Sequence, residues 1–129
     1  MLFRSQIDTD KIGTSIAGIS AYGDNENALG AGIKSGKFVI WKRQQNKHEI
    51  LFNGDAAKSK IVYFKMTATA GHLFKFAISE NGINWVNIGG EVDGAYLPPW
   101  DRSVRVALYT GGAENAAAKF NFLRIEPVK

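Results

Sequence analysis

The stretch Lys60–Ser79, KIVYFKMTATAGHLFKFAIS, decides the fold because its apolar residues recur at every second position. The apolar set is Val62, Phe64, Met66 and Ala68, followed by Phe74, Phe76 and Ile78. Successive side chains of a β-strand point to opposite faces, so this period indicates two strands with one buried face each. The Thr-Ala-Gly-His segment between them is a turn signal and predicts an antiparallel pair.

The same alternation extends along the rest of the chain. Toward the C-terminus it is found in SVRVALYT (103–110) and AAAKFNF (116–122). Earlier strands are expected at Leu2–Asp8, Thr14–Tyr22, Ala28–Lys34, Lys37–Arg43 and Glu49–Phe52. Ten or so short strands joined by tight turns predict an all-β fold, a two-sheet antiparallel sandwich of the jelly-roll type. The helix-like pieces 54–60 and 112–119 are too short for stable helices and are expected to be turns or a single helical turn.

Composition narrows the classes of function. The 129 residues fit one domain, and we expect residues 1–129 to be a single jelly-roll domain from a longer protein. No cysteine is present, which excludes disulfides and thiolate metal sites. The net charge of +4 comes from scattered lysines and arginines without a basic run, so nucleic-acid binding is disfavoured. No apolar stretch reaches membrane-spanning length, and the first ten residues lack the apolar region of a signal peptide.

The segment Ser79–Trp85, SENGINW, predicts a hairpin closed by a tryptophan. Asn81 and Gly82 both tolerate positive φ and favour a tight hairpin, so Phe74–Ser79 is expected to pair with Asn84–Ile88, the return strand that Trp85 begins. The segment is similar to the Asp-box of sialidases, one residue short and with Asn in place of Asp. There the side chain before the glycine caps backbone N–H groups. We expect Trp85 to be turn-closing core; the alternative is a ligand platform.

A second aromatic, Trp41, is the strongest candidate for a binding surface. If Phe38 and Ile40 face the core, Trp41 and Arg43 lie on the outer face of the sheet, with the indole exposed. An apolar ring of that size is normally covered, so a ligand or a neighbouring domain is expected on it. Other residues expected on the same polar and aromatic surface are Tyr63, Lys65, Lys75, Arg105 and Tyr109.

Two loops offer further candidates. Glu91–Ser103 holds Tyr96, Trp100 and Asp101 beside two prolines, an arrangement that suits sugar recognition or an ordinary crossover loop. The oxygens of the loop 24–27 could bind Ca²⁺, although the spacing of an EF-hand is absent and acidic turns are common. We expect no metal and no cofactor.

Catalytic patterns are missing from the sequence. His48 and His72 lack the spacing of metal ligands, and no nucleophile elbow or phosphate loop is present. A glycosidase needs two carboxylates that face one bond. The close acid pairs are Asp8/Asp10, Asp24/Glu26 and Glu91/Asp93, and all of them fall at expected strand ends or in loops. The chain is therefore not expected to be an enzyme by itself.

Three runs carry a resemblance to a known group: AGISAYGDNENALGAGIKSGKFVIW, FKFAISENGINWVNIGGEVDGAYL, and VRVALYTGG with AAAKFNFLRIEP. They resemble the concanavalin A-like, laminin-G-like jelly-roll domain found C-terminal to family 43 glycoside hydrolases, which are β-xylosidases and α-arabinofuranosidases. The family domain usually has an additional pair of opening strands. The resemblance implies a bacterial, extracellular or periplasmic protein, with a role in packing on the catalytic domain or in glycan binding.

From these observations we expect a non-catalytic accessory or carbohydrate-binding module of a polysaccharide-degrading enzyme. The partners would be a plant polysaccharide and a catalytic domain in the same parent chain. The expected sugar contacts are Trp41, Arg43, Tyr63, Arg105 and Tyr109, with Tyr96, Trp100 and Asp101 as the loop alternative. A purely structural interdomain module is the first alternative, and an enzyme of another type is the second.

Overall fold

A computed structural model describes residues 2–8, 15–70, 72–97, 105–111 and 119–126. These residues form ten strands and the turns between several of them. In chain order they are β1 (Leu2–Asp8), β2 (Ile16–Tyr22), β3 (Ala28–Lys34), β4 (Lys37–Gln44), β5 (Lys47–Ala56), β6 (Ile61–Thr69), β7 (Leu73–Ser79), β8 (Val86–Asp93), β9 (Arg105–Gly111) and β10 (Lys119–Glu126). No helix is present within these ranges, and so none there is long and apolar enough to cross a membrane.

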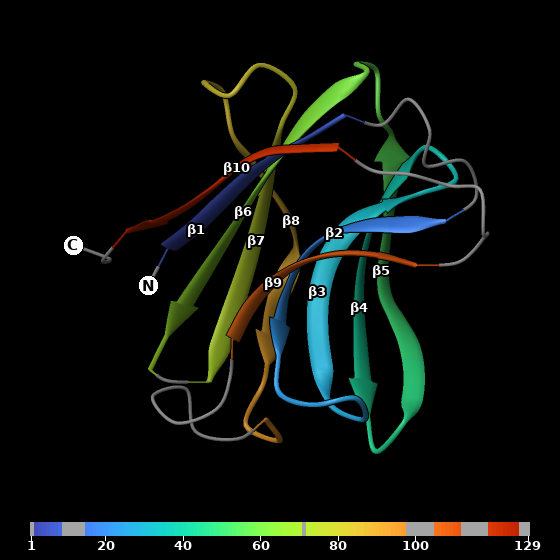
Figure 1. The fold of residues 1–129 in the computed structure, drawn as a ribbon, viewed down its shortest axis with the longest axis vertical. Coiled ribbons are helices and arrows are strands. Elements are labelled where there is room, and N and C mark those ends of the chain that lie inside the picture. Colours follow the sequence, from blue (N-terminus) through green and yellow to red (C-terminus); the bar gives the residue numbers. More distant parts are fainter. Residues whose placement is uncertain (1, 9–14, 71, 98–104, 112–118, 127–129) are drawn as a thin grey trace.

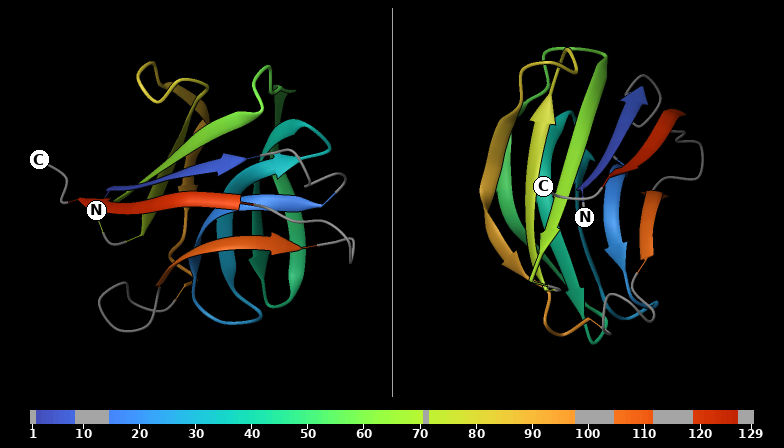
Figure 2. Two further views of the ribbon diagram at one scale, coloured as in Figure 1. Left: turned by 45° about the horizontal axis from the view of Figure 1, so that its top comes forward. Right: turned by 90° about the vertical axis from the view of Figure 1, so that its left-hand side faces the viewer.

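The strands form two antiparallel sheets of five (Figures 1 and 2). The first sheet has the order β10-β1-β6-β7-β8, and the second has the order β5-β4-β3-β2-β9. One apolar cluster fills the space between them, with Phe64, Phe74 and Phe76 from the first sheet and Ile19, Leu29 and Ile40 from the second. The predicted two-sheet sandwich is confirmed. Leu2 pairs with Glu126, so the first and last strands lie side by side.

The predicted strands are confirmed, although their lengths differ: β2 begins at Ile16, β10 continues to Glu126, and β5 shows the largest difference. Val62, Phe64, Met66 and Ala68 are buried as the alternation requires. However, β5 runs from 47 to 56, whereas only Glu49–Phe52 was expected. This edge strand is mostly exposed, so its polar ends carry no alternation that could mark them. Residues 54–56, predicted as part of a turn, therefore continue the strand, and residues 112–118 lie outside the described ranges.

Two tight hairpins fix the register of the second sheet. Ser35 and Gly36 join β3 to β4, and Gln45 and Asn46 join β4 to β5, all with positive φ. Two successive residues of positive φ match the twist of paired strands, which makes this the preferred two-residue hairpin. The first hairpin consequently sets Trp41 opposite Gly30.

The β7–β8 hairpin is only partly as predicted: Phe76–Ile78 pairs with Val86–Ile88, but Phe74 pairs with Val92. The predicted tight turn at Asn81 and Gly82 is wrong, because residues 80–85 separate the two strands and only Gly82 of the pair has positive φ.

Asn81 Oδ1 accepts hydrogen bonds from the backbone N–H groups of Ile83 (2.8 Å) and Asn84 (2.9 Å), which confirms the predicted cap. Trp85 is only half-buried and meets the ring of Tyr63 edge-on at 6.5 Å. The Lys65 ammonium lies 4.3 Å from the centre of the indole ring. Trp85 closes the turn over the outer face of the first sheet, so its assignment to the core is wrong.

Candidate functional site

The outer face of the second sheet carries the candidate site. Its central row runs across four strands, from Trp41 on β4 through Gly30 on β3 and Ser20 on β2 to Ala107 on β9. The row on one side places Tyr109 opposite Gly18, and the row on the other pairs Arg43 with Ala28. Small residues therefore occupy the middle of the sheet, and large side chains stand at its two sides.

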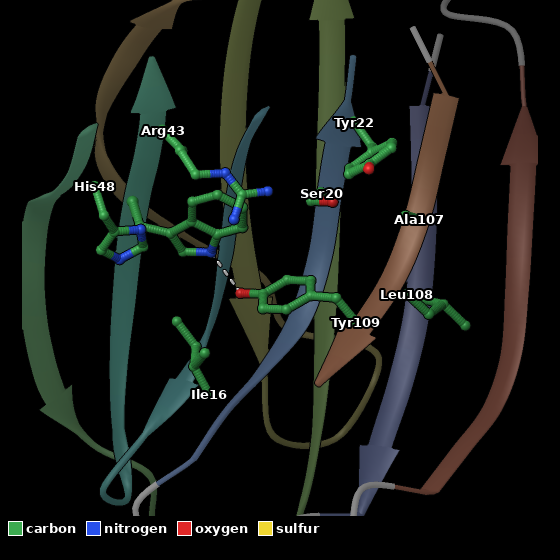
Figure 3. A pocket seen from close by; sticks show the side chains of 9 residues that line it. Ile16, Ser20, Tyr22, Arg43, His48, Ala107, Leu108 and Tyr109 are labelled. Carbon is green, nitrogen blue, oxygen red and sulfur yellow. Dashed lines mark hydrogen bonds between the residues drawn. The ribbon is translucent and has the colours of Figure 1, made fainter. Parts of the chain in front are cut away.

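This arrangement leaves a pocket of about 540 Å³, within the range of ordinary ligand sites (Figure 3). We call it the Trp41 pocket; its lining residues are Ile16, Ser20, Tyr22, Trp41, Arg43, His48, Ala107, Leu108 and Tyr109.

An aromatic pair forms one wall of the Trp41 pocket. The indole Nε1–H of Trp41 donates a hydrogen bond of 2.6 Å to the hydroxyl of Tyr109, and the two rings meet edge-on at 5.3 Å. His48 stacks on the indole at 5.5 Å with an angle of 26° between the rings. Burial raises the pKa of the Tyr109 hydroxyl above its usual range, and the hydrogen bond from Trp41 offsets part of that increase.

Glycines in the neighbouring strands make room for these rings. A Cβ atom on Gly30 would lie 3.0 Å from Cζ2 of Trp41, and one on Gly32 would overlap the Tyr109 hydroxyl oxygen. The two aromatic side chains start from strands that β3 and β2 separate, and they meet over this glycine floor. The floor is thus a geometric requirement of the aromatic pair.

The polar side of the pocket is positively charged. Arg43 reaches from β4 into the pocket (Figure 3), and its Nε atom is buried without a hydrogen-bond partner among the described residues. His48 stands directly opposite Arg43 in the β4–β5 pair. Partial burial lowers the pKa of His48 below its ordinary 6.5, and the charges of Arg43 and Lys34 lower it further.

The structure brings together only part of the predicted contact set. Trp41, Arg43 and Tyr109 share the Trp41 pocket. The backbone of Arg105 lies opposite Tyr22 on the same sheet, and its side chain is outside the described part of the structure. Tyr63 belongs to β6 in the first sheet, where it accepts a hydrogen bond of 2.5 Å from Gln6 Nε2. The expected common surface is therefore wrong for Tyr63, and likewise for Lys65 and Lys75 on the same sheet.

The predicted exposure of Trp41 is also wrong. The residue lies on the outer face, as expected, but only 6% of it is accessible. Tyr109 and His48 cover the indole, so the ring serves as a wall of the pocket and presents no open stacking surface.

The loop alternative is only partly described. Tyr96 is half-buried, its hydroxyl donates a hydrogen bond of 2.6 Å to the carbonyl oxygen of Ala28, and Lys42 lies 5.7 Å from its ring centre. Burial raises the pKa of Tyr96 to about 12, although the charge of Arg43 acts in the opposite direction. These contacts tie Tyr96 to the sandwich. Trp100 and Asp101 lie outside the described residues.

The acidic residues that the structure describes contribute no cluster to this face. Asp24 Oδ1 accepts hydrogen bonds from the backbone N–H groups of Glu26 and Asn27, both at 2.8 Å, so the carboxylate organises its own turn. Across the described ranges, no group of three or more His, Asp or Glu side chains is placed to hold a metal ion. Glu91 and Asp93 are exposed on β8 in the other sheet.

Sequence reasoning missed His48, Ser20 and Tyr22 as members of the pocket. The sequence did indicate that Ser20 and Tyr22 face outward. The residues at positions 16, 18, 20 and 22 alternate with Ala17, Ile19 and Ala21, which belong to the core between the sheets. His48 could have been found from the hairpin, since a two-residue turn at 45–46 sets it opposite Arg43.

The chain matches no family model and none of the curated proteins. Among solved structures, it is similar to a family 43 glycoside hydrolase from Bacillus licheniformis, with 20% identity and a TM-score of 0.77 over 95% of this chain and 26% of that one. A bifunctional GH43-CE protein from Bacteroides eggerthii gives 21% identity and a TM-score of 0.80 over 97% and 18% of the two chains.

A xylan β-1,4-xylosidase from Bacillus halodurans gives 17% identity and a TM-score of 0.78 over 95% of this chain and 27% of that one. The chain thus spans about a quarter or less of the length of these proteins. At the level of fold, the predicted resemblance is confirmed: this chain has the fold of a β-sandwich domain found in family 43 glycoside hydrolases.

Proposed function

We propose that the chain is a non-catalytic accessory domain of a polysaccharide-degrading glycoside hydrolase, and that it binds carbohydrate in the Trp41 pocket. The observation that carries the proposal is the extent of the structural similarity. Almost the whole chain superposes on about a quarter of a family 43 enzyme, which is what an appended domain would give. The xylosidase among the similar structures makes xylan the first polysaccharide to test.

The composition of the Trp41 pocket supports binding without chemistry. Its described lining holds aromatic rings, hydroxyl groups and a guanidinium group, which pack against sugar rings and hydrogen-bond their hydroxyls. A glycosidase mechanism requires a pair of carboxylates, and none of the described residues that line the pocket is acidic.

Affinity electrophoresis of the isolated chain in gels that contain xylan tests this proposal. Wild-type protein should be retarded, and Tyr22→Ala, which removes one half-buried wall of the pocket, should weaken the retardation. Unchanged retardation of Tyr22→Ala would show that the sugar-binding site lies outside the Trp41 pocket. Turnover of an aryl xyloside that is lost on Glu91→Gln would replace the proposal with an enzymatic function.

A structural interdomain module is the second candidate, and a different surface favours it. Ile83 and Val86 flank Trp85 at the β7–β8 hairpin and are 79% and 62% exposed. Exposed apolar side chains that gather in one place mark contact surfaces. If no polysaccharide retards the chain, and Ile83→Ser with Val86→Ser changes only its association with a catalytic domain, this candidate replaces the first.

A further inference from the structure

Arg43 is the feature of the Trp41 pocket that protein contacts leave unexplained. Its guanidinium group points into the pocket (Figure 3), and the buried Nε–H has no acceptor among the described residues. Arg43 as a whole is half-buried, but its Nε–H is buried, and buried polar groups in native proteins are nearly always hydrogen-bonded. The group therefore requires an acceptor that the described residues do not supply.

The charges around Arg43 define what that acceptor is. His48 stands opposite Arg43, and Lys34 is close enough to act on the pKa of His48. Among the described residues, the nine that line the pocket include no carboxylate that would neutralise the charge of Arg43. A pocket whose described lining holds the Arg43 cation and no carboxylate attracts an anion, and a guanidinium fork binds a carboxylate through two parallel hydrogen bonds.

The other walls of the pocket indicate what kind of molecule the carboxylate is attached to. The Trp41–Tyr109 pair provides an apolar wall, and Ser20 and Tyr22 bring hydroxyl groups to the opposite side. The volume of about 540 Å³ accommodates one or two sugar rings. A ring that has an apolar face, several hydroxyls and one carboxylate matches all three walls.

We propose that the Trp41 pocket binds a uronic acid unit of a polysaccharide, with its carboxylate on the guanidinium group of Arg43. This inference rests on the proposed carbohydrate-binding function and adds the chemical class of the sugar. Arg43 provides the specificity, because a neutral sugar of the same shape offers its N–H groups only uncharged hydroxyl acceptors, whereas a carboxylate forms a charge-assisted bidentate pair.

The test compares one polymer before and after a single chemical change. The probes are a xylan that carries glucuronic acid side groups and the same xylan after reduction of its carboxyl groups to alcohols. The wild-type chain should bind the native polymer at least tenfold more tightly than the reduced one, as expected for loss of a charge-assisted pair. Arg43→Gln should remove this preference, whereas Arg43→Lys should retain part of it.

Lys58→Gln is the matched control, because it removes one positive charge from an exposed position outside the pocket. Equal loss of binding in Lys58→Gln and Arg43→Gln would show nonspecific attraction and overturn the inference. Urea unfolding of each variant separates lost binding from lost folding. If Arg43→Gln does not fold, the shift of the Trp41 indole N–H resonance in wild-type protein decides: it should saturate at a lower concentration of native than of reduced polymer, and equal titrations or no shift overturn the inference.

The two proposals fail in different ways. Equal affinity for the native and reduced polymers leaves carbohydrate binding in place and overturns the role of the carboxylate. Absence of binding to either polymer overturns both.

Discussion

The glycine floor predicts that Gly32→Ala is destabilising although it adds one methyl group. The new Cβ would overlap both the Tyr109 hydroxyl and the carbonyl oxygen of Ala17. The carbonyl belongs to the β2–β3 ladder and cannot move freely, so the tyrosine ring must shift and its hydrogen bond with Trp41 must break. Overpacking costs about 1–3 kcal/mol, and a lost hydrogen bond costs about 0.5–1.5 kcal/mol. The opposing gain from replacing a strand glycine by alanine is about 0.5–1 kcal/mol. We therefore expect a net loss of about 1–3 kcal/mol in the free energy of unfolding.

Gly90→Ala is the matched control, because a Cβ atom on Gly90 would meet nothing within 4 Å. It should leave stability unchanged or increase it slightly. Urea unfolding measures both variants, and with a slope of about 1–3 kcal/mol per molar a loss of 2 kcal/mol lowers the midpoint by about 1 M. Equal midpoints for Gly32→Ala and Gly90→Ala would refute the packing of Tyr109 over the floor.

Three further variants test other parts of the structure. Trp41→Phe removes the indole donor to Tyr109 and should cost about 1–3 kcal/mol in urea unfolding; an exposed tryptophan would cost less than about 0.5 kcal/mol. Asn81→Ala removes the acceptor for two backbone N–H groups and should cost about 1–2 kcal/mol by the same measurement, with Asn81→Asp close to wild type because it retains the oxygen. The pKa of His48 is lowered in the folded protein, so the unfolded state binds the proton first and folding stability falls as pH decreases below 6.5 until the folded ring is also protonated. Thermal unfolding measured between pH 7.5 and 5 should therefore show a smaller loss of stability for His48→Gln than for wild type. Equal losses of stability in the two proteins would contradict the lowered pKa of His48.

Alternation within each strand was enough to predict the core. Phe64, Phe74 and Phe76 were assigned to the buried face from their period alone, and all three are buried. A strand has only two faces, so each apolar residue fixes the side of its neighbours. The same logic placed Trp41 and Arg43 together on the outer face of β4.

Alternation does not tell which sheet a strand joins. Tyr63 and Trp41 both face outward, but β6 lies between β1 and β7, whereas β4 lies between β5 and β3. The pairing of β9 with β2 likewise joins segments that are far apart in the sequence. Which outward residues share a surface is decided by this strand order, and that information is not local.

Coverage of an outward side chain is equally non-local. Trp41 is buried because Tyr109, 68 positions away, reaches over glycines of a strand between them. An inspection of residues 37–44 alone predicts an exposed ring, since nothing in that segment can cover it. The alternation of Gly30 and Gly32 with Ala31 and Ile33 was visible in the sequence, but its meaning depends on the register of β3 against β4.

The two proposed roles can be separated by what each requires of Arg43. Packing explains the aromatic pair and its glycine floor, since both are buried and mutually complementary. It does not explain a guanidinium group that is directed into the pocket with its Nε–H unpaired. A neighbouring domain could satisfy this group only with an acceptor of its own, preferably an acidic side chain. A sugar ligand could satisfy it with a carboxylate. Because the binding test uses residues 1–129 without a catalytic domain, a preference for the carboxylate polymer would show that the acceptor is carried by the sugar.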